Sequence, residues 1–175
     1  MKIRAATHND VPSMVRLIGH YASEGLMLPR SSNAVTASLP EYIVADLDGE
    51  IVGCGALQQY SDDSAEIYGL ATDPKCSPRG TGTALVEALI QKARSESIAR
   101  VFAMTLAPGF FLRMGFHTVQ HRNVPLKVWK DCVACPKYGN CDEIAMLLEV
   151  LQDPHPAFGN PLPELPEGEI REPYG

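Results

Sequence analysis

Two neighbouring segments, Glu66-Ile-Tyr-Gly-Leu-Ala-Thr-Asp-Pro74 and Arg79-Gly-Thr-Gly-Thr-Ala-Leu-Val-Glu-Ala-Leu89, carry the strongest structural signal in this sequence. The first has the composition of an apolar strand and ends at an Asp-Pro pair. The second opens with two closely spaced glycines and continues with apolar residues at helical spacing, at positions 85, 88, 89 and 93. The sequence therefore predicts a strand, a glycine-containing loop and a helix, in that order.

A loop of this kind before a helix is a candidate anion site. Glycine lets the backbone approach a ligand closely and turn its N–H groups outward, and the positive end of the helix attracts a pyrophosphate. Arg79 adds a cation beside the loop. Taken alone, the pattern is also that of a tight turn. It is not a P-loop, because Gly-Lys-Ser/Thr is missing, and no acidic ribose-binding residue follows at the spacing of a Rossmann fingerprint.

Length and composition indicate one globular domain with a distinct tail. The chain has 175 residues, of which 45% are hydrophobic and 21% are charged. We expect one catalytic domain over residues 1–152. Residues 153–175 hold six prolines, five acids and one base, so the tail has a net charge of −4 and the domain only −2. Such a tail cannot bury a core, and we expect it to be extended.

The same composition limits the classes of partner. The near-neutral domain lacks the basic stripe that a nucleic acid requires. No apolar run approaches the roughly 20 residues of a membrane helix, and the N-terminus lacks a signal peptide. We therefore expect a cytoplasmic protein without a nucleic-acid or membrane partner. Five cysteines, an odd number, favour reduced thiols over a disulfide framework.

Hydrophobic periodicity along the chain predicts a mixed sheet. Asp48-Gly49 between apolar runs predicts a hairpin. Helices are expected after Asp10, after Asn33, over 82–95 and over 110–114. Strands are expected over residues 3–6, 41–46, 51–60, 64–72, 100–106, 117–122, 126–131 and 144–150. This order predicts an α/β (α+β) fold with a mixed central β-sheet of about seven strands flanked by helices.

Three parts of the sequence resemble the GNAT superfamily of N-acetyltransferases. The Arg79–Gly82 loop resembles its motif A, which binds the pyrophosphate of acetyl-coenzyme A (acetyl-CoA). Arg4-Ala-Ala-Thr-x-x-Asp10-Val-Pro12 resembles the superfamily's opening, and Phe110-Phe-x-x-Met-Gly-Phe116 resembles its closing motif. The resemblance covers about residues 2–150. It implies the GNAT fold, with acetyl-CoA as cosubstrate and no required metal.

Within the superfamily, the sequence is most similar to the bacterial amino-acid N-acetyltransferases that make N-acetylglutamate. The likeness rests on four segments: Gly25-Leu-Met-Leu-Pro-Arg-Ser31, Val52-Gly-Cys-Gly-Ala-Leu57, Glu66-Ile67 and Lys127-Val-Trp-Lys-Asp-Cys132 with the cysteines that follow it. It implies direct transfer of acetyl to the α-amino group of an amino acid, with glutamate in arginine biosynthesis as the expected substrate.

Glu66 is the candidate general base. An amine must be neutral to attack a thioester, yet an α-amino group has a pKa near 8, so a base has to remove a proton. Glu66 interrupts an apolar strand shortly before the anion loop. Apolar surroundings raise the pKa of a carboxylic acid, which suits this role, and the base could act through a water. The alternative is a strand-edge glutamate that pairs with a surface cation.

The resemblance also implies which groups hold the cofactor. The N–H of Leu70 would face the thioester oxygen and stabilise charge that appears only in the transition state. Gly69 would permit the strand bulge that the superfamily has here. The implied contacts to the pantetheine arm and the phosphates come from Leu70, Ala71, Thr72, Ser77, Arg79, Gly80, Thr81, Gly82, Thr83 and Phe111.

Two positions depart from the superfamily pattern. Ser77 stands first in the phosphate motif, where members have Gln or Arg, so one side-chain contact to a phosphate is in doubt. Phe111 stands where many members have a tyrosine that protonates the departing thiolate, and a phenyl ring cannot donate a proton. A thiol with a pKa of about 8.5 can leave as the thiolate, so catalysis does not depend on this acid. Tyr68 is either a substitute acid or an ordinary strand tyrosine.

A dicarboxylate substrate requires cations, and arginine forms bidentate pairs with carboxylates. Arg30 is the first candidate, and Lys127 is the second; either can equally be a surface cation. Many relatives have an arginine two residues after the strand glutamate, where this chain has Tyr68, and this difference weakens the case for glutamate. Tyr68 is also a candidate contact to the substrate.

Cys132, Cys135 and Cys141 form a thiol cluster in one loop. They would bind zinc if His121 or Asp142 supplied a fourth ligand, but the paired Cys-x2-Cys sets of structural zinc sites are missing. Reduced thiols that pack a loop are the other interpretation. This cluster and the two departures leave a non-catalytic CoA-binding or metal-binding regulatory module as an alternative to the enzyme. Acetylation of another small amine or of a protein N-terminus is a second alternative, and a homodimer is possible.

Overall fold

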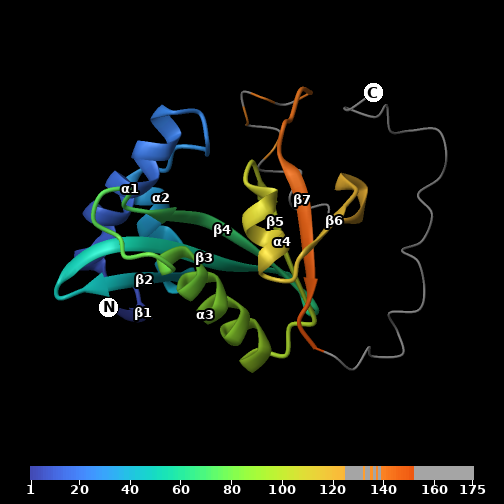
Figure 1. The fold of residues 1–175 in the computed structure, drawn as a ribbon, viewed down its shortest axis with the longest axis horizontal. Coiled ribbons are helices and arrows are strands. Elements are labelled where there is room, and N and C mark those ends of the chain that lie inside the picture. Colours follow the sequence, from blue (N-terminus) through green and yellow to red (C-terminus); the bar gives the residue numbers. More distant parts are fainter. Residues whose placement is uncertain (125–131, 133–134, 136, 138, 152–175) are drawn as a thin grey trace.

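The computed structural model describes residues 1–124, 132, 135, 137 and 139–151 of the chain. Within them, seven strands form one sheet in the order β1-β2-β3-β4-β5-β7-β6 (Figure 1). The strands are β1 Lys2–Ala5, β2 Tyr42–Leu47, β3 Glu50–Ser61, β4 Ser64–Thr72, β5 Arg100–Thr105, β6 His117–Val119 and β7 Ile144–Glu149. The predicted mixed sheet of about seven strands and the α/β class are therefore confirmed.

The strand directions follow from the connections between them. β2 and β3 form the hairpin predicted at Asp48-Gly49, and all neighbouring strands except one pair run antiparallel. The exception is β4 with β5, which are parallel because helix α3 crosses over between them. The predicted strand-loop-helix unit is therefore a β4-α3-β5 crossover at the centre of the sheet.

Helices cover both faces of this sheet. Where the chain is described, they are α1 Val11–Ser23, α2 Ser32–Ala37, α3 Thr81–Ser95 and α4 Pro108–Arg113. The buried side of α1 shares one apolar cluster with Val35 of α2 and with residues of β2 and β3. The apolar stripe of α3 shares another cluster with Phe111 of α4 and with residues of β4, β5 and β7. We call these the α1 face and the α3 face of the sheet.

Some element bounds differ from the expectations. α4 begins at Pro108 and not at residue 110, because proline is well suited to the first turn of a helix, where its missing N–H costs nothing. β6 ends at Val119 because a 3₁₀ turn over His121–Asn123 follows it. The strand expected over 126–131 and the tail over 153–175 lie outside the described residues. Among the helices that are described, none has the length and apolarity needed to cross a membrane.

Candidate active site

The central strands β4 and β5 separate after a short paired section. Only Ser64–Glu66 of β4 pair with residues 100–102 of β5, although β4 continues to Thr72 and β5 to Thr105. The two strands diverge from this point, as Figure 1 shows. Backbone N–H and C=O groups along the diverging edges are not used in a ladder between these two strands, so they can bind an extended ligand.

A bulge in β4 lies beside this opening. Cys54 of β3 pairs with Ala71, and Ala56 pairs with Tyr68, so β4 has one residue more than β3 over this interval. Gly69 takes up the extra length with a φ of +59°, in the left-handed region. As a result Tyr68 and Ala71, three residues apart, both pack on the α1 face, while Leu70 packs on the α3 face. The prediction that Gly69 permits a bulge is confirmed.

Tyr42 of β2 holds this bulge in place. Its side chain is 1% exposed, and a Cβ atom added to Gly69 would lie 2.9 Å from the Tyr42 hydroxyl oxygen. Burial raises the pKa of Tyr42 to about 12, so the phenol stays neutral. The space at position 69 therefore admits only glycine unless the tyrosine ring moves.

Glu66 is a buried carboxylate in the middle of the sheet. It pairs with Gln58 on one side and Phe102 on the other, and it is 9% exposed. The Tyr60 hydroxyl donates a hydrogen bond of 3.0 Å to its Oε2 atom. The alternative of a strand-edge glutamate is therefore wrong, because β4 is a central strand. Glu66 lies three residues before the bulge at Gly69, and this position suits a proton acceptor.

The chain leaves β4 through a turn that Asp73 organises. Its Oδ1 atom accepts the N–H groups of Lys75 and Cys76 at 2.9 and 3.1 Å, and these hydrogen bonds lower the pKa of Asp73. Its Oδ2 atom lies 3.2 Å from Nη1 of Arg16. Asp73 was not among the predicted site residues, although the Asp-Pro pair at the end of a strand is a turn signal.

Helix α3 begins in the loop that was predicted to bind the pyrophosphate. Gly80 is the N-cap residue with a φ of +87°. The hydroxyl of Thr81 donates to Pro78 O at 2.7 Å, so this side chain stabilises the loop from within. Among the described residues, the N–H groups of Gly82 and Thr83 have no backbone acceptor, as is usual in the first turn of a helix. These two amides can therefore bind an anion.

Other predicted cofactor residues lie around the same helix terminus. Arg79 is exposed next to the two amides, and Ser77 is half-buried, with its N–H bonded to Asp73 O at 3.1 Å. The ring of Phe110 lies beside Gly82, 3.6 Å from the place of a Cβ atom. Phe111 is 5% exposed and packs edge-to-face between Phe110 and Phe116 in the core. Phe110 is thus the aromatic residue that contacts the anion loop, and sequence analysis missed it.

The candidate substrate residues Arg30 and Tyr68 lie together on the α1 face. The guanidinium carbon of Arg30 lies 4.4 Å from the centre of the Tyr68 ring, a cation–π contact. The Tyr68 hydroxyl donates to Oε2 of Glu41. Burial, together with this hydrogen bond, raises the pKa of Tyr68. The Tyr68 hydroxyl proton is thus engaged with the Glu41 carboxylate. Lys127 lies outside the described residues.

One thiol of the predicted cluster, Cys132, lies near Glu66. Cys132 packs against the buried Phe102 and Val124, and its pKa is raised to about 11 by burial and by the neighbouring acids Cys141, Glu143, Cys135 and Glu66. The Asp142 carboxylate is paired with Lys137 at 2.7 Å. His121 bonds through Nε2 to the carbonyl oxygen of Glu143. Among the described residues, no group of three His, Cys, Asp or Glu side chains is arranged to hold a metal ion.

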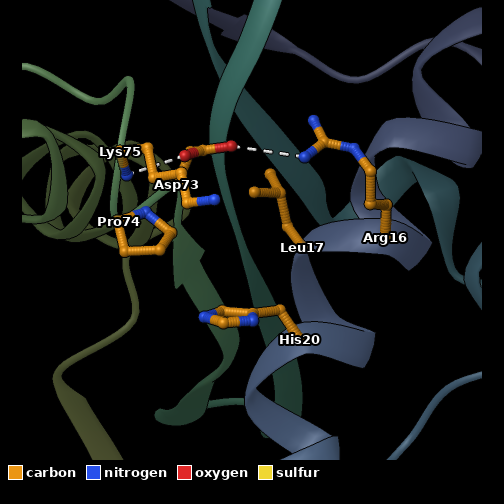
Figure 2. Close-up of a pocket in the computed structure, with 6 residues that line it drawn as sticks. All are labelled: Arg16, Leu17, His20, Asp73, Pro74 and Lys75. Atoms are coloured by element: carbon orange, nitrogen blue, oxygen red, sulfur yellow. Dashed lines mark hydrogen bonds and ion pairs between the residues drawn. The ribbon is translucent and has the colours of Figure 1, made fainter.

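A pocket of about 230 Å³ lies between α1 and the loop after β4 (Figure 2). In this view the Arg16 side chain reaches toward Asp73, and the His20 ring lies below this ion pair. The lining residues are Arg16, Leu17, His20, Asp73, Pro74 and Lys75. None of the predicted site residues is among them, although Asp73, Pro74 and Lys75 belong to the segment that connects Thr72 to Ser77.

The splayed strands, the bulge and the candidate anion site at the start of α3 lie together in one region of the sheet. The sequence profile of the acetyltransferase (GNAT) family matches residues 18–116, more than half of the chain. This chain belongs to the GNAT family. An uncharacterised N-acetyltransferase of Chlorobaculum tepidum is 38% identical to it over 145 residues, which are 83% of this chain and 94% of the relative.

Two further GNAT relatives have more specific names. The amino-acid acetyltransferase of Mycobacterium tuberculosis is 35% identical over 74% of this chain and 75% of its own length. A structure of N-acetylglutamate synthase from Neisseria gonorrhoeae, complexed with coenzyme A and N-acetyl-glutamate, has a TM-score of 0.79 and 27% sequence identity. It covers 86% of this chain, but the chain spans only 35% of that longer protein. The chain is therefore an acetyl-CoA-dependent GNAT N-acetyltransferase.

Proposed function

We propose that this GNAT enzyme transfers acetyl from acetyl-CoA to the α-amino group of an amino acid, with glutamate in arginine biosynthesis as the substrate. The observation that carries the proposal is the buried carboxylate of Glu66, three residues from the bulge at Gly69. The relatives named amino-acid acetyltransferase support the substrate class. The amine and its acyl donor would meet where β4 and β5 diverge.

Glu66 acts in this proposal as the general base. It accepts a proton from the ammonium form of the substrate, directly or through a water, and the neutral amine then attacks the thioester carbon. The C–N bond forms first and gives a tetrahedral intermediate; the C–S bond then breaks, and the second proton of the attacking nitrogen is lost to solvent, without a covalent enzyme intermediate. The N–H of Leu70 stabilises the oxyanion that develops between these steps. The CoA thiolate leaves without an acid, because Phe111 has no proton to donate.

The cofactor binds along the diverging edge of β4 and at the start of α3. Ala71 and Thr72 hold the pantetheine arm through their backbone groups. The N–H groups of Gly82 and Thr83, together with Arg79, bind the pyrophosphate. The remaining residues of the site shape it: Ser77, Gly80 and Thr81 form the loop, and Phe111 supports Phe110 from the core.

Arg30 supplies the cation for a substrate carboxylate. Its guanidinium lies over Tyr68, so positive charge is present beside the strand position two residues after Glu66, although that position itself holds a tyrosine. Glu41 fixes the Tyr68 ring that Arg30 contacts. An arginine in this position can bind a carboxylate in a bidentate manner. Lys127 is the second candidate for the same role.

The test follows thiol release from acetyl-CoA with a panel of amino acids and amines that lack a carboxylate. We expect turnover with glutamate. Glu66→Gln should lower kcat by roughly 10²–10⁴-fold without weakening acetyl-CoA binding. Arg30→Ala should raise the KM for glutamate by about 10–100-fold and leave acetyl-CoA binding unchanged. Binding of acetyl-CoA without turnover of any amine would contradict the proposal and favour a regulatory module.

A further inference from the structure

Tyr60 occupies an irregular position in β3. Gln59 pairs with Ala65, and Ser61 pairs with Ser64, so β3 has one residue more than β4 over this interval. Tyr60 is that additional residue. A bulge changes the direction in which a side chain points, and bulges are frequent next to active sites. Here the bulge is in β3, and Gln58 of the same strand pairs with Glu66 of β4.

Among the described residues, two contacts help to fix the Tyr60 side chain. Its ring lies 5.6 Å from the ring of Phe102, centre to centre, at an angle of 51°. Phe102 is fully buried and is the β5 partner of Glu66, so it offers a rigid surface. The Tyr60 hydroxyl donates its hydrogen bond to Oε2 of Glu66 at 3.0 Å. The ring is thus supported on one side, and the hydroxyl reaches the carboxylate.

We propose that Tyr60 is a positioning residue for the acetyl transfer, which holds the Glu66 carboxylate in one orientation and favours its ionised form. This inference rests on the proposed role of Glu66 as the base. Burial disfavours a carboxylate, whereas a hydrogen bond donated to the ionised form favours it. The donor therefore lets a buried glutamate remain a base at neutral pH.

The surroundings of Glu66 contain another titratable group. This group is the Cys132 thiol, which interacts electrostatically with Glu66. Phe102, the partner of Glu66 on β5, has no titratable group. Within the described part of the chain, Tyr60 is the group whose hydrogen bond to Glu66 has a defined geometry. Loss of its hydroxyl should therefore destabilise the carboxylate, and protonation of Glu66 should occur at higher pH.

Tyr60→Phe tests this role because it keeps the ring on Phe102 and removes only the hydroxyl. A hydrogen bond to a charged group corresponds to about 1–2 pH units, so the acidic limb of kcat/KM should move upward by that amount. The KM for acetyl-CoA should stay unchanged. Tyr21→Phe is the matched control, since the Tyr21 hydroxyl donates to an uncharged acceptor, Thr72 O, at 2.8 Å. This control should leave the acidic limb where it is.

Two further measurements separate the possible failures. Carbon-13 NMR of labelled Glu66 should show a raised carboxyl pKa in Tyr60→Phe, independently of activity. In the background of Glu66→Gln, the Tyr60→Phe change should have little further effect on kcat, because residues that act as a unit are not additive. If Tyr60→Phe changes neither the pH profile nor the pKa of the Glu66 carboxyl, while Glu66→Gln is inactive, the role of Tyr60 alone is overturned. A fully active Glu66→Gln would overturn the proposed base together with it.

Discussion

Replacing Gly69 by alanine should disturb the bulge in two ways. The φ of +59° is a left-handed conformation, which costs a residue with a Cβ atom about 1–2 kcal/mol. The new Cβ would also lie 2.9 Å from the buried Tyr42 hydroxyl oxygen, well inside ordinary contact distance. Overpacking of a closed site adds about 1–3 kcal/mol. We expect Gly69→Ala to lower the free energy of unfolding by about 2–5 kcal/mol.

The same change should affect catalysis more than stability. If the strand shifts to relieve the clash, the N–H of Leu70 moves from the position where it would meet the thioester oxygen. Removal of one such donor lowers kcat by roughly 10²–10³-fold. We therefore expect kcat to fall by about 100-fold in the thiol-release assay, in samples that remain folded by circular dichroism.

Two glycines elsewhere in the chain provide matched controls. Gly49, in the β2–β3 turn, has a φ of +95° but no atom within 4 Å of an added Cβ, so Gly49→Ala measures the backbone strain alone. Gly19, in α1, has neither a positive φ nor a close atom, and Gly19→Ala should raise stability by about 0.5–1 kcal/mol. A Gly69→Ala protein with a normal kcat, and no less stable than Gly49→Ala, would refute this reasoning.

Two further predictions concern stability and thiol reactivity. Hydrogen bonds from Arg4 at 2.7 and 2.9 Å lower the pKa of Asp10 from 3.8 to about 2, so the stability from this pair should be complete above about pH 4 and should be lost as the pH falls toward 2. Urea unfolding between pH 2 and 7 should show this loss, and Asp10→Asn should reduce it. Burial raises the pKa of the Cys54 thiol to about 12, whereas Cys76 is exposed. A disulfide reagent should therefore label Cys76 in the native protein and Cys54 only after unfolding; labelling of native Cys54 would contradict its burial.

Much of the fold could be read from local signals. The hairpin at Asp48-Gly49 and the crossover around α3 follow from turn chemistry and from hydrophobic periodicity, which act over a few residues. The bulge at Gly69 was accessible because a glycine inside a strand marks a special backbone conformation. The helix terminus at Gly80 was found for the same reason. These features depend mainly on which φ and ψ angles each residue tolerates.

The contacts around the candidate site could not be predicted in this way. The Tyr60 hydroxyl bonds to Glu66 because a one-residue bulge in β3 changes the strand register. No local sequence pattern predicts that register. Arg30 reaches Tyr68 across 38 positions of sequence, through the way the segment between α1 and α2 packs on the sheet. The distinct roles of Phe110 and Phe111 depend on how α4 is rotated against the core, which the sequence motif does not specify.

The sequence by itself was thus enough to predict the architecture, the candidate anion loop and a carboxylate in an apolar strand. Backbone preferences and hydrophobic periodicity are local properties, so they can be recognised without the tertiary structure. Packing decided which side chains meet that carboxylate and which aromatic residue lies at the helix terminus. Such contacts depend on strand register and helix rotation, and those are set by the simultaneous fit of many residues in the core.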